Sequence, residues 1–234
     1  MLIDLHAHTS GISPCCRIDY EKVIDTAIEN GIDGIVLTNH YQKSYMGEIS
    51  EAEFVKKYIR EYELTRKAAE KKNFRVFFGV EVTMEKYPNV HMLIFGVEPS
   101  FLEENEGICD LTQEELYSLV NKYDGILVQA HPFRNGCTVL DTKFLDGVEI
   151  NCHPLYKNSY CEKLTAVAFK NDLRITCGGD FHADTYRPKC GMYLPDDIRG
   201  EKALRNYICT AEKITICHHE PDGECAVDKE FEVK

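Results

Sequence analysis

Short apolar runs alternate along this chain with longer segments whose apolar residues recur at helical spacing. The runs are continuous, rich in Val and Ile, and four to seven residues long, which is typical of parallel strands that are covered on both faces. The pattern therefore predicts seven strands, over residues 2–5, 34–38, 76–82, 91–97, 125–130, 147–150 and 173–177.

The segments between the runs predict five helices. The first stops before Gly31, a residue type that commonly ends helices. Ser50 and Thr112 are each followed three residues later by Glu, which is the capping box that begins a helix. We therefore expect helices over residues 20–30, 50–72, 112–123, 159–171 and 197–207.

Alternating strands and helices favour either a wound parallel sheet or a (βα) barrel. With 234 residues and 44% apolar content, the chain is long enough for a full core and fits one domain of barrel size. We interpret residues 1–213 as this α/β domain. Residues 214–234 are then an acidic C-terminal extension of the same domain.

The extension has its own cluster of possible metal ligands, namely Cys217, His218, His219 and Cys225 around a Pro-Asp-Gly turn. Their spacing fits no common zinc-ligand pattern, so zinc binding is the less favoured interpretation. A terminal hairpin or strand is the simpler prediction.

Composition narrows the possible partners and the compartment. The chain has 27 Lys and Arg against 39 Asp and Glu, and its net charge of −12 disfavours an extended nucleic acid or an anionic membrane as partner. No secretory leader pattern or long apolar stretch is visible, so we expect a cytoplasmic protein. The eleven cysteines are then expected to be reduced thiols, most of them buried.

Ionisable side chains lie at the ends of six of the predicted strands. The carboxyl ends of barrel strands converge on one face, where imidazoles and carboxylates together hold zinc, manganese or iron. Two nearby ions need an anionic ligand between them, and Glu81 is placed for that role, with Asp180 as a second negative ligand. The candidate metal ligands are His6, His8, His40, Glu81, His91, His131, Asp180 and His182.

These residues stand in the motifs DLHAHTS, TNH, GVEV, HMLIFG, AHP and GGDFH. In this order the motifs resemble the polymerase and histidinol phosphatase (PHP) superfamily of metal-dependent phosphoesterases, over about residues 1 to 190. The resemblance implies a distorted seven-stranded (βα)7 barrel, similar to a TIM barrel, with two to three divalent metal ions at its C-terminal face. It assigns one ion to His6, His8, Glu81 and Asp180, a second to Glu81, His91 and His131, and a third to His40, His182 and one further ligand.

The chain departs from the superfamily pattern at the position of this further ligand. Its members commonly supply Asp or His five or six residues after the HxH pair, where this chain has Ser13 and Pro14, followed by Cys15 and Cys16. One hypothesis is that Cys15 or Cys16 donates a thiolate, which would favour zinc. The alternative is a weak or empty third position.

A phosphorylated substrate also needs positive groups near the ions. Arginine is best suited, because its planar fork binds two oxygens at once. Asp4 is a candidate partner for an imidazole N–H, or it has a structural role alone. The candidate substrate contacts follow the ligand motifs or end the sixth strand, and they are Arg134, Arg187, Lys189 and His153, with Arg17 and Lys43 as further candidates.

The sequence therefore predicts hydrolysis of a small phosphomonoester by a metal-activated hydroxide. Three alternatives stay open: a small-molecule phosphodiesterase, another metal-dependent hydrolase such as an amidohydrolase, and a non-catalytic metal-binding scaffold. Histidinol phosphate is one substrate suggested by analogy alone. The candidate catalytic residues are Glu81, Asp180, His182 and Arg134.

Overall fold

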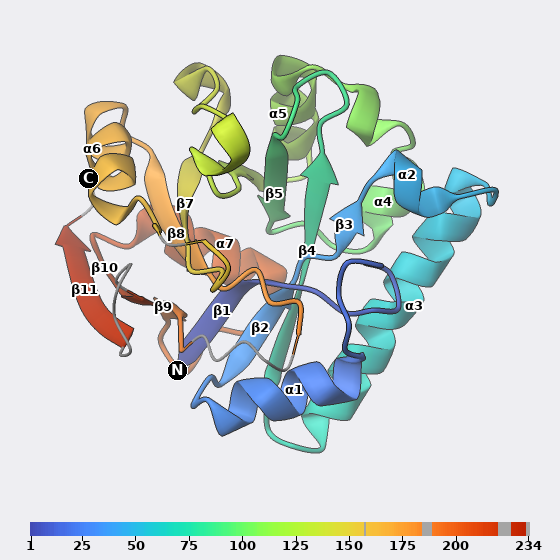
Figure 1. Ribbon diagram of the computed structural model, residues 1–234, viewed down its shortest axis with the longest axis horizontal. Helices are drawn as coiled ribbons and strands as arrows, with labels where there is room; N and C mark the ends of the chain where they lie inside the picture. The colour runs from blue at the N-terminus through green and yellow to red at the C-terminus, as the bar shows by residue number, and fades with distance from the viewer. Residues whose placement is uncertain (157, 184–188, 220–225, 233–234) are drawn as a thin grey trace.

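The computed structural model describes residues 1–156, 158–183, 189–219 and 226–232. Within them, eleven strands form one curled sheet with helices around its outer side (Figure 1). The strands are β1 (Leu2–Ala7), β2 (Gly34–Leu37), β3 (His40–Tyr41), β4 (Arg75–Thr83), β5 (His91–Phe95), β6 (Ile126–Gln129), β7 (Gly147–Asn151), β8 (Arg174–Gly178), β9 (Gly191–Tyr193), β10 (Lys213–His219) and β11 (Ala226–Glu232). The helices are α1 (Tyr20–Glu29), α2 (Lys43–Met46), α3 (Glu51–Glu70), α4 (Ser100–Glu104), α5 (Gln113–Lys122), α6 (Cys161–Lys170) and α7 (Gly200–Thr210).

The α/β class is confirmed, but the sheet has more strands than the seven expected. Its order is β11-β10-β9-β1-β2-β4-β5-β6-β7-β8, with β3 paired to β4. Strands β3 and β9 are only two and three residues long, too short to stand out as apolar runs. An isolated bridge between Ala7 and Phe181 joins the end of β1 to the segment after β8. The sheet curls into a half-barrel, and the distorted seven-stranded (βα)7 barrel that we expected is not confirmed.

Strand β5 runs antiparallel to both of its neighbours, β4 and β6, so the all-parallel expectation was wrong here. The connection from β4 to β5 is residues 84–90, and a parallel crossover needs a dozen or more residues. Such a short connection makes a hairpin, in which Thr83 pairs with His91. The beginning of β5 consequently lies at the same edge as the end of β4.

Local capping signals located the starts of α3 and α5 and the end of α1. Ser50 and Glu53 form the predicted capping box of α3, and Thr112 and Glu115 form that of α5. Gly31, just after α1, has a φ of 72°, the left-handed conformation that glycine adopts most readily. Helix α7 begins three residues later than expected.

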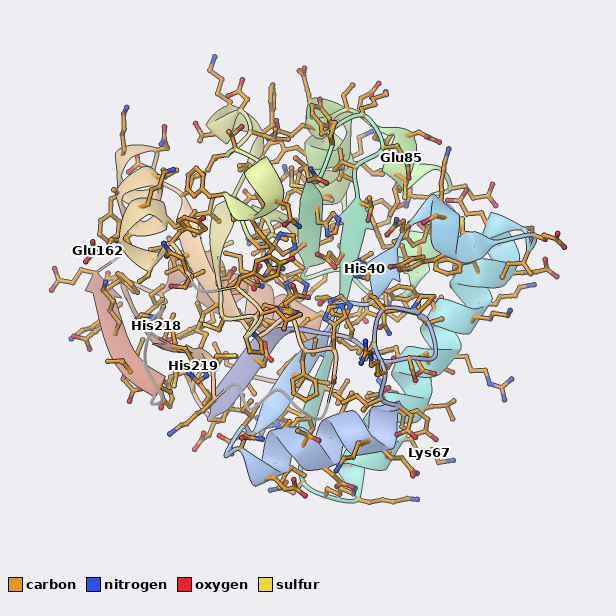
Figure 2. All side chains as sticks on the ribbon, viewed as in Figure 1. His40, Lys67, Glu85, Glu162, His218 and His219 are labelled. Carbon is orange, nitrogen blue, oxygen red and sulfur yellow. The ribbon has the colours of Figure 1, made fainter. Side chains whose placement is uncertain are left out.

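The C-terminal hairpin is confirmed, because β10 pairs antiparallel with β11 along the whole of both strands. His218 and His219 are the last two residues of β10, and they lie away from His40 (Figure 2). Cys225 lies outside the described residues. Eight of the ten described cysteines are buried, as expected.

None of the helices in the described part of the chain combines the length and apolar character needed to cross a bilayer.

Candidate metal centre

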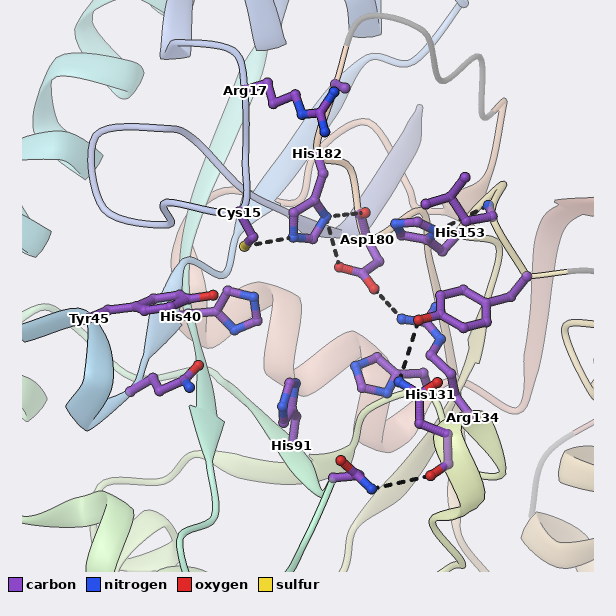
Figure 3. A pocket seen from close by; sticks show the side chains of 16 residues that line it. Cys15, Arg17, His40, Tyr45, His91, His131, Arg134, His153, Asp180 and His182 are labelled. Atoms are coloured by element: carbon purple, nitrogen blue, oxygen red, sulfur yellow. Dashed lines mark hydrogen bonds and ion pairs between the residues drawn. The ribbon is translucent and has the colours of Figure 1, made fainter.

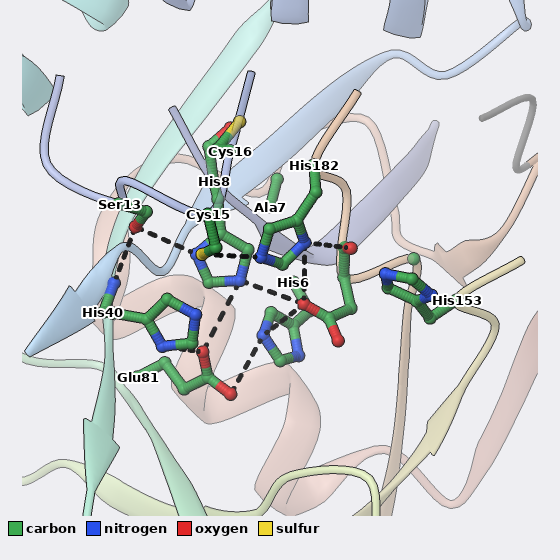
Figure 4. Close-up of polar contacts among 12 residues, drawn as sticks. His6, Ala7, His8, Ser13, Cys15, Cys16, His40, Glu81, His153 and His182 are labelled. Atoms are coloured by element: carbon green, nitrogen blue, oxygen red, sulfur yellow. Dashed lines mark hydrogen bonds and ion pairs between the residues drawn. The ribbon is translucent and has the colours of Figure 1, made fainter. Parts of the chain in front are cut away.

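Glu81, near the end of β4, is fully buried and lies at the centre of five imidazoles. Figure 4 shows three of these imidazoles, His6, His8 and His40. The nitrogen-to-oxygen distances are 2.7 Å from Nδ1 of His40, 2.9 Å from Nδ1 of His91, 3.1 Å from Nε2 of His131, 3.4 Å from Nε2 of His6 and 3.5 Å from Nε2 of His8. The structure therefore brings together candidate ligands from five strands or strand ends.

The charge of Glu81 follows from these contacts. Burial alone would raise the pKa of its carboxyl, but the charges of His40, His6 and His91 outweigh burial and hold that pKa well below its usual value. Glu81 is thus a buried, ionised carboxylate, which suits it to hold cations.

Asp180 supplies the second carboxylate of the cluster. Its Oδ1 atom lies 3.1 Å from Nε2 of His8 and 3.5 Å from Nε2 of His6. Burial raises its pKa, but the charges of His6 and Arg134 overcome this and keep that pKa well below its usual value. The backbone of Asp180 has a φ of 52°, a left-handed conformation that directs the carboxylate into the cluster.

Gly178 allows β8 to approach β1 at this point. A Cβ atom on Gly178 would lie 2.4 Å from the Cβ of His6 and 2.9 Å from Oε1 of Glu149. A side chain at position 178 would therefore displace His6, a candidate ligand, and this explains why the residue is glycine.

Glu149, on β7, is a further candidate residue of the site that the sequence reasoning missed. Its Oε1 atom lies 2.8 Å from Nδ1 of His6, and its Oε2 atom accepts hydrogen bonds from the backbone N–H of His131 at 2.9 Å and from Asn151 Nδ2 at 3.0 Å. With Nδ1 engaged, the Nε2 atom of His6 faces the cluster. A carboxylate inside the buried run Gly147–Asn151 was the signal that could have revealed it.

Of the two roles considered for Asp4, its contacts fit the structural one. Its Oδ1 atom accepts hydrogen bonds from the backbone N–H groups of His6, at 3.0 Å, and Gly179, at 2.8 Å. Burial raises its pKa to about 7. Asp4 thus ties the end of β8 to β1, and Glu149 is the partner of the His6 imidazole instead.

Ser13, which follows the HxH pair by five residues, contacts the imidazole of His8 and the backbone of His40. Its Oγ atom lies 3.3 Å from Nδ1 of His8, donates to Oδ1 of Asn39 at 2.9 Å and accepts from the backbone N–H of His40 at 3.0 Å. Pro14 beside it is exposed.

His182 lies at the outer side of the cluster, next to Cys15. The Nδ1 atom of His182 is 2.7 Å from the backbone oxygen of Asp180, and its Nε2 atom is 3.1 Å from Sγ of Cys15. Burial opposes ionisation of the Cys15 thiol, but hydrogen bonds with His182 and His40 lower its pKa to about 6.

The unpaired atoms of the cluster fit divalent cations. Nε2 of His6, Nδ1 of His40 and Oε2 of Glu81 are buried and have no hydrogen-bond partner, although the latter two atoms are only 2.7 Å apart. Buried polar atoms normally have partners, and atoms that converge without a hydrogen bond between them suit a shared cation. Three groups of residues that each include His6, His40 or Glu81 have donor atoms within 4.8 Å of one another. They are His8, His40 and His182; His6, His8 and Glu81; and His40, Glu81 and His91.

A cavity of about 540 Å³ opens over the cluster (Figure 3). Arg134 lines it, and its guanidinium group contacts Asp180 and Asn151 and lies 4.1 Å from the ring centroid of Tyr156. His153 lines it as well, and burial lowers the pKa of this imidazole to about 4, so it is neutral at pH 7.

The other candidate substrate contacts lie in different places. Arg17 lines the cavity. Lys43 pairs with Asp110 at 2.6 Å, and both side chains are exposed. Lys189 is exposed and is not among the described residues that line the cavity. Arg187 lies outside the described residues.

Solved structures share this fold. A two-domain protein from Bacteroides vulgatus that contains a predicted PHP-like metal-dependent phosphoesterase matches 94% of this chain with a TM-score of 0.70 and 16% identity. The present chain spans 65% of the length of that protein. An amidohydrolase from Chromobacterium violaceum, solved with bound sulfate and no metal, matches 88% of this chain and 97% of its own, with a TM-score of 0.54 and 17% identity.

PsfC from Pseudomonas syringae also matches, over 99% of this chain and 91% of its own, with a TM-score of 0.61 and 16% identity. At these identities the likeness establishes the fold alone. No curated protein matches the sequence. The sequence model of the PHP domain, however, matches residues 4–184, a stretch that includes every candidate ligand from His6 to His182. The chain belongs to the PHP domain family.

Proposed function

We propose that this chain is a metal-dependent phosphoesterase that hydrolyses a small phosphomonoester. The observation that carries the proposal is the buried, ionised Glu81 among five imidazoles, with Asp180 in the same cluster. Membership of the PHP domain family supports it. Divalent ions bound there would polarise the phosphoryl oxygens and lower the pKa of a water molecule, so that it attacks phosphorus near neutral pH.

Two to three ions, of zinc, manganese or iron, are proposed. Glu81 would contribute to two positions, since its two oxygens face different imidazoles. Asp180 adds a second negative charge beside His8, and the two carboxylates together offset the repulsion between cations. The proposed sets are His6, His8, Glu81 and Asp180 for one ion, Glu81, His91 and His131 for a second, and His40 with His182 for a third.

Arg134 and His153 would act on the substrate. Arg134 brings a positive charge to the cavity wall directly beside Asp180, where negative charge on the phosphoryl oxygens needs stabilisation. Because Asn151 and Tyr156 also hold the guanidinium group, its position is fixed before the substrate binds. His153 is neutral at pH 7 and can hydrogen-bond the substrate without adding charge.

The cavity favours a small substrate over a polymer. Its volume of about 540 Å³ is in the range of small-molecule sites, and the net charge of −12 disfavours nucleic acid. Glu81 would take the bridging place between the ions, and no lysine is among the described residues that line the cavity. The amidohydrolase alternative with a modified lysine therefore has less support.

The test is release of inorganic phosphate from a panel of phosphomonoesters and small diesters. The protein is stripped of metal and reloaded with manganese, zinc or iron. We expect metal-dependent release from at least one monoester, loss of that release in His131→Ala and its retention in His219→Ala, which changes a histidine outside the cavity. Release from diesters alone would favour the phosphodiesterase, and bound ions without any release would favour the scaffold.

A further inference from the structure

The loop between β1 and α1 carries two adjacent cysteines to the edge of the metal centre. Its two sides are joined by a hydrogen bond from the backbone N–H of Ser10 to the oxygen of Ile18, at 2.9 Å. The backbone N–H of Arg17 donates to the oxygen of His182 at 2.8 Å. The loop is therefore fixed directly against the segment that carries His182.

The two cysteines of this loop have opposite surroundings. The Sγ atom of Cys15 lies 3.1 Å from Nε2 of His182, and the same thiol interacts with the side chains of His40 and Tyr45 (Figures 3 and 4). Cys16 is buried, and its thiol donates to the backbone oxygens of His8 and Ile18, at 3.4 and 3.5 Å. Of the pair, only Cys15 is directed at the imidazoles.

The tautomer of His182 supports a ligand role for the atom that faces Cys15. Nδ1 of His182 lies 2.7 Å from the backbone oxygen of Asp180, and a carbonyl oxygen can only accept, so Nδ1 carries the hydrogen. The lone pair is then on Nε2, the usual arrangement for a histidine that binds a metal ion.

His8 lies near His40 and His182, but in the sets proposed above it belongs to another ion, so the position formed by His40 and His182 needs a further protein ligand. Ser13 does not supply it, because its hydroxyl contacts His8 and Asn39. We propose that Cys15 is this ligand, and that its thiolate makes the position selective for zinc over manganese. Thiolates are soft ligands that select zinc, whereas manganese prefers oxygen. Two imidazoles and one thiolate leave a fourth coordination place open, as in catalytic zinc sites. The inference rests on the metal-dependent function proposed above.

X-ray absorption at the zinc edge tests the proposal without relying on activity. The protein is loaded with zinc, and wild type is compared with Cys15→Ser and with the matched control Cys16→Ser. We expect a zinc–sulfur distance of about 2.3 Å in wild type and in the control, and its loss in Cys15→Ser. We also expect Cys15→Ser to bind one zinc ion per chain more weakly than wild type and the control do.

Alkylation by iodoacetamide gives a second readout, because Cys15 is exposed. Zinc should protect Cys15 from the reagent, and manganese should not. The partly buried Cys209, outside the cavity, is the internal reference whose labelling zinc leaves unchanged.

The outcomes separate this inference from the proposed function. Zinc bound through nitrogen and oxygen alone, or a sulfur signal that persists in Cys15→Ser, would overturn the inference and leave the phosphoesterase proposal standing. Failure of the wild-type protein to bind any zinc, manganese or iron would overturn both.

Discussion

The Oε1 atom of Glu149 lies 2.8 Å from Nδ1 of His6, and both side chains are buried. This contact sets the ring of His6 so that its Nε2 atom faces Glu81. Loss of such a supporting partner typically costs 10- to 100-fold in metal affinity. Glu149 also accepts a hydrogen bond from the backbone N–H of His131. The same carboxylate therefore supports two candidate ligands, His6 and His131.

We therefore expect Glu149→Ala to weaken metal binding roughly 10- to 100-fold, measured by titration of the stripped protein. Glu149→Gln keeps the shape and one acceptor but not the charge, so its affinity should fall between those of wild type and Glu149→Ala. Wild-type affinity in Glu149→Ala would show that His6 does not need this partner.

Gly178→Ala should distort the centre by steric overlap. The new Cβ atom would lie 2.4 Å from the Cβ of His6, with both strands held in the sheet. We expect a loss of about 1–3 kcal/mol in the free energy of unfolding, measured by urea denaturation, together with weaker metal binding. In the control, Gly11→Ala, the added methyl meets only the flexible end of Glu61, and a loss as large as that of Gly178→Ala would contradict the steric explanation.

Removal of divalent ions should lower the thermal midpoint. An ion held at 100 times its dissociation constant contributes about 2.7 kcal/mol, so reloading the stripped protein should raise Tm by about 5 to 10 °C. Differential scanning calorimetry measures the shift. Glu81→Gln removes the central ligand, so its Tm should not respond to the same ions; an equal rise in this variant would exclude Glu81 as a ligand.

Arg134→Ala tests the substrate-binding role without removing a proposed metal ligand. If the guanidinium group stabilises phosphoryl charge, kcat/KM for the active phosphomonoester should fall by about 100- to 1000-fold while the bound metal stays the same. Arg17→Ala changes another arginine that lines the cavity and should have a much smaller effect. Similar losses in the two variants would mean that Arg134 contributes only general positive charge.

Local signals were sufficient for much of the fold. Apolar runs located the central strands, and the capping boxes at Ser50 and Thr112 located two helix starts. The direction of β5 was missed because it depends on the length of a connection rather than on the composition of the strand.

The sequence by itself determined which side-chain types meet in the candidate metal centre, because strand ends in this α/β fold converge and the motifs from His6 to His182 stand at or near those ends. Only the tertiary structure decided which residues contact these candidate ligands and orient their side chains. Glu149 is 143 positions from His6, and Cys15 is 167 positions from His182. Periodicity and spacing report what lies within a few residues along the chain, whereas contacts between distant residues arise only when the curled sheet brings its strands together.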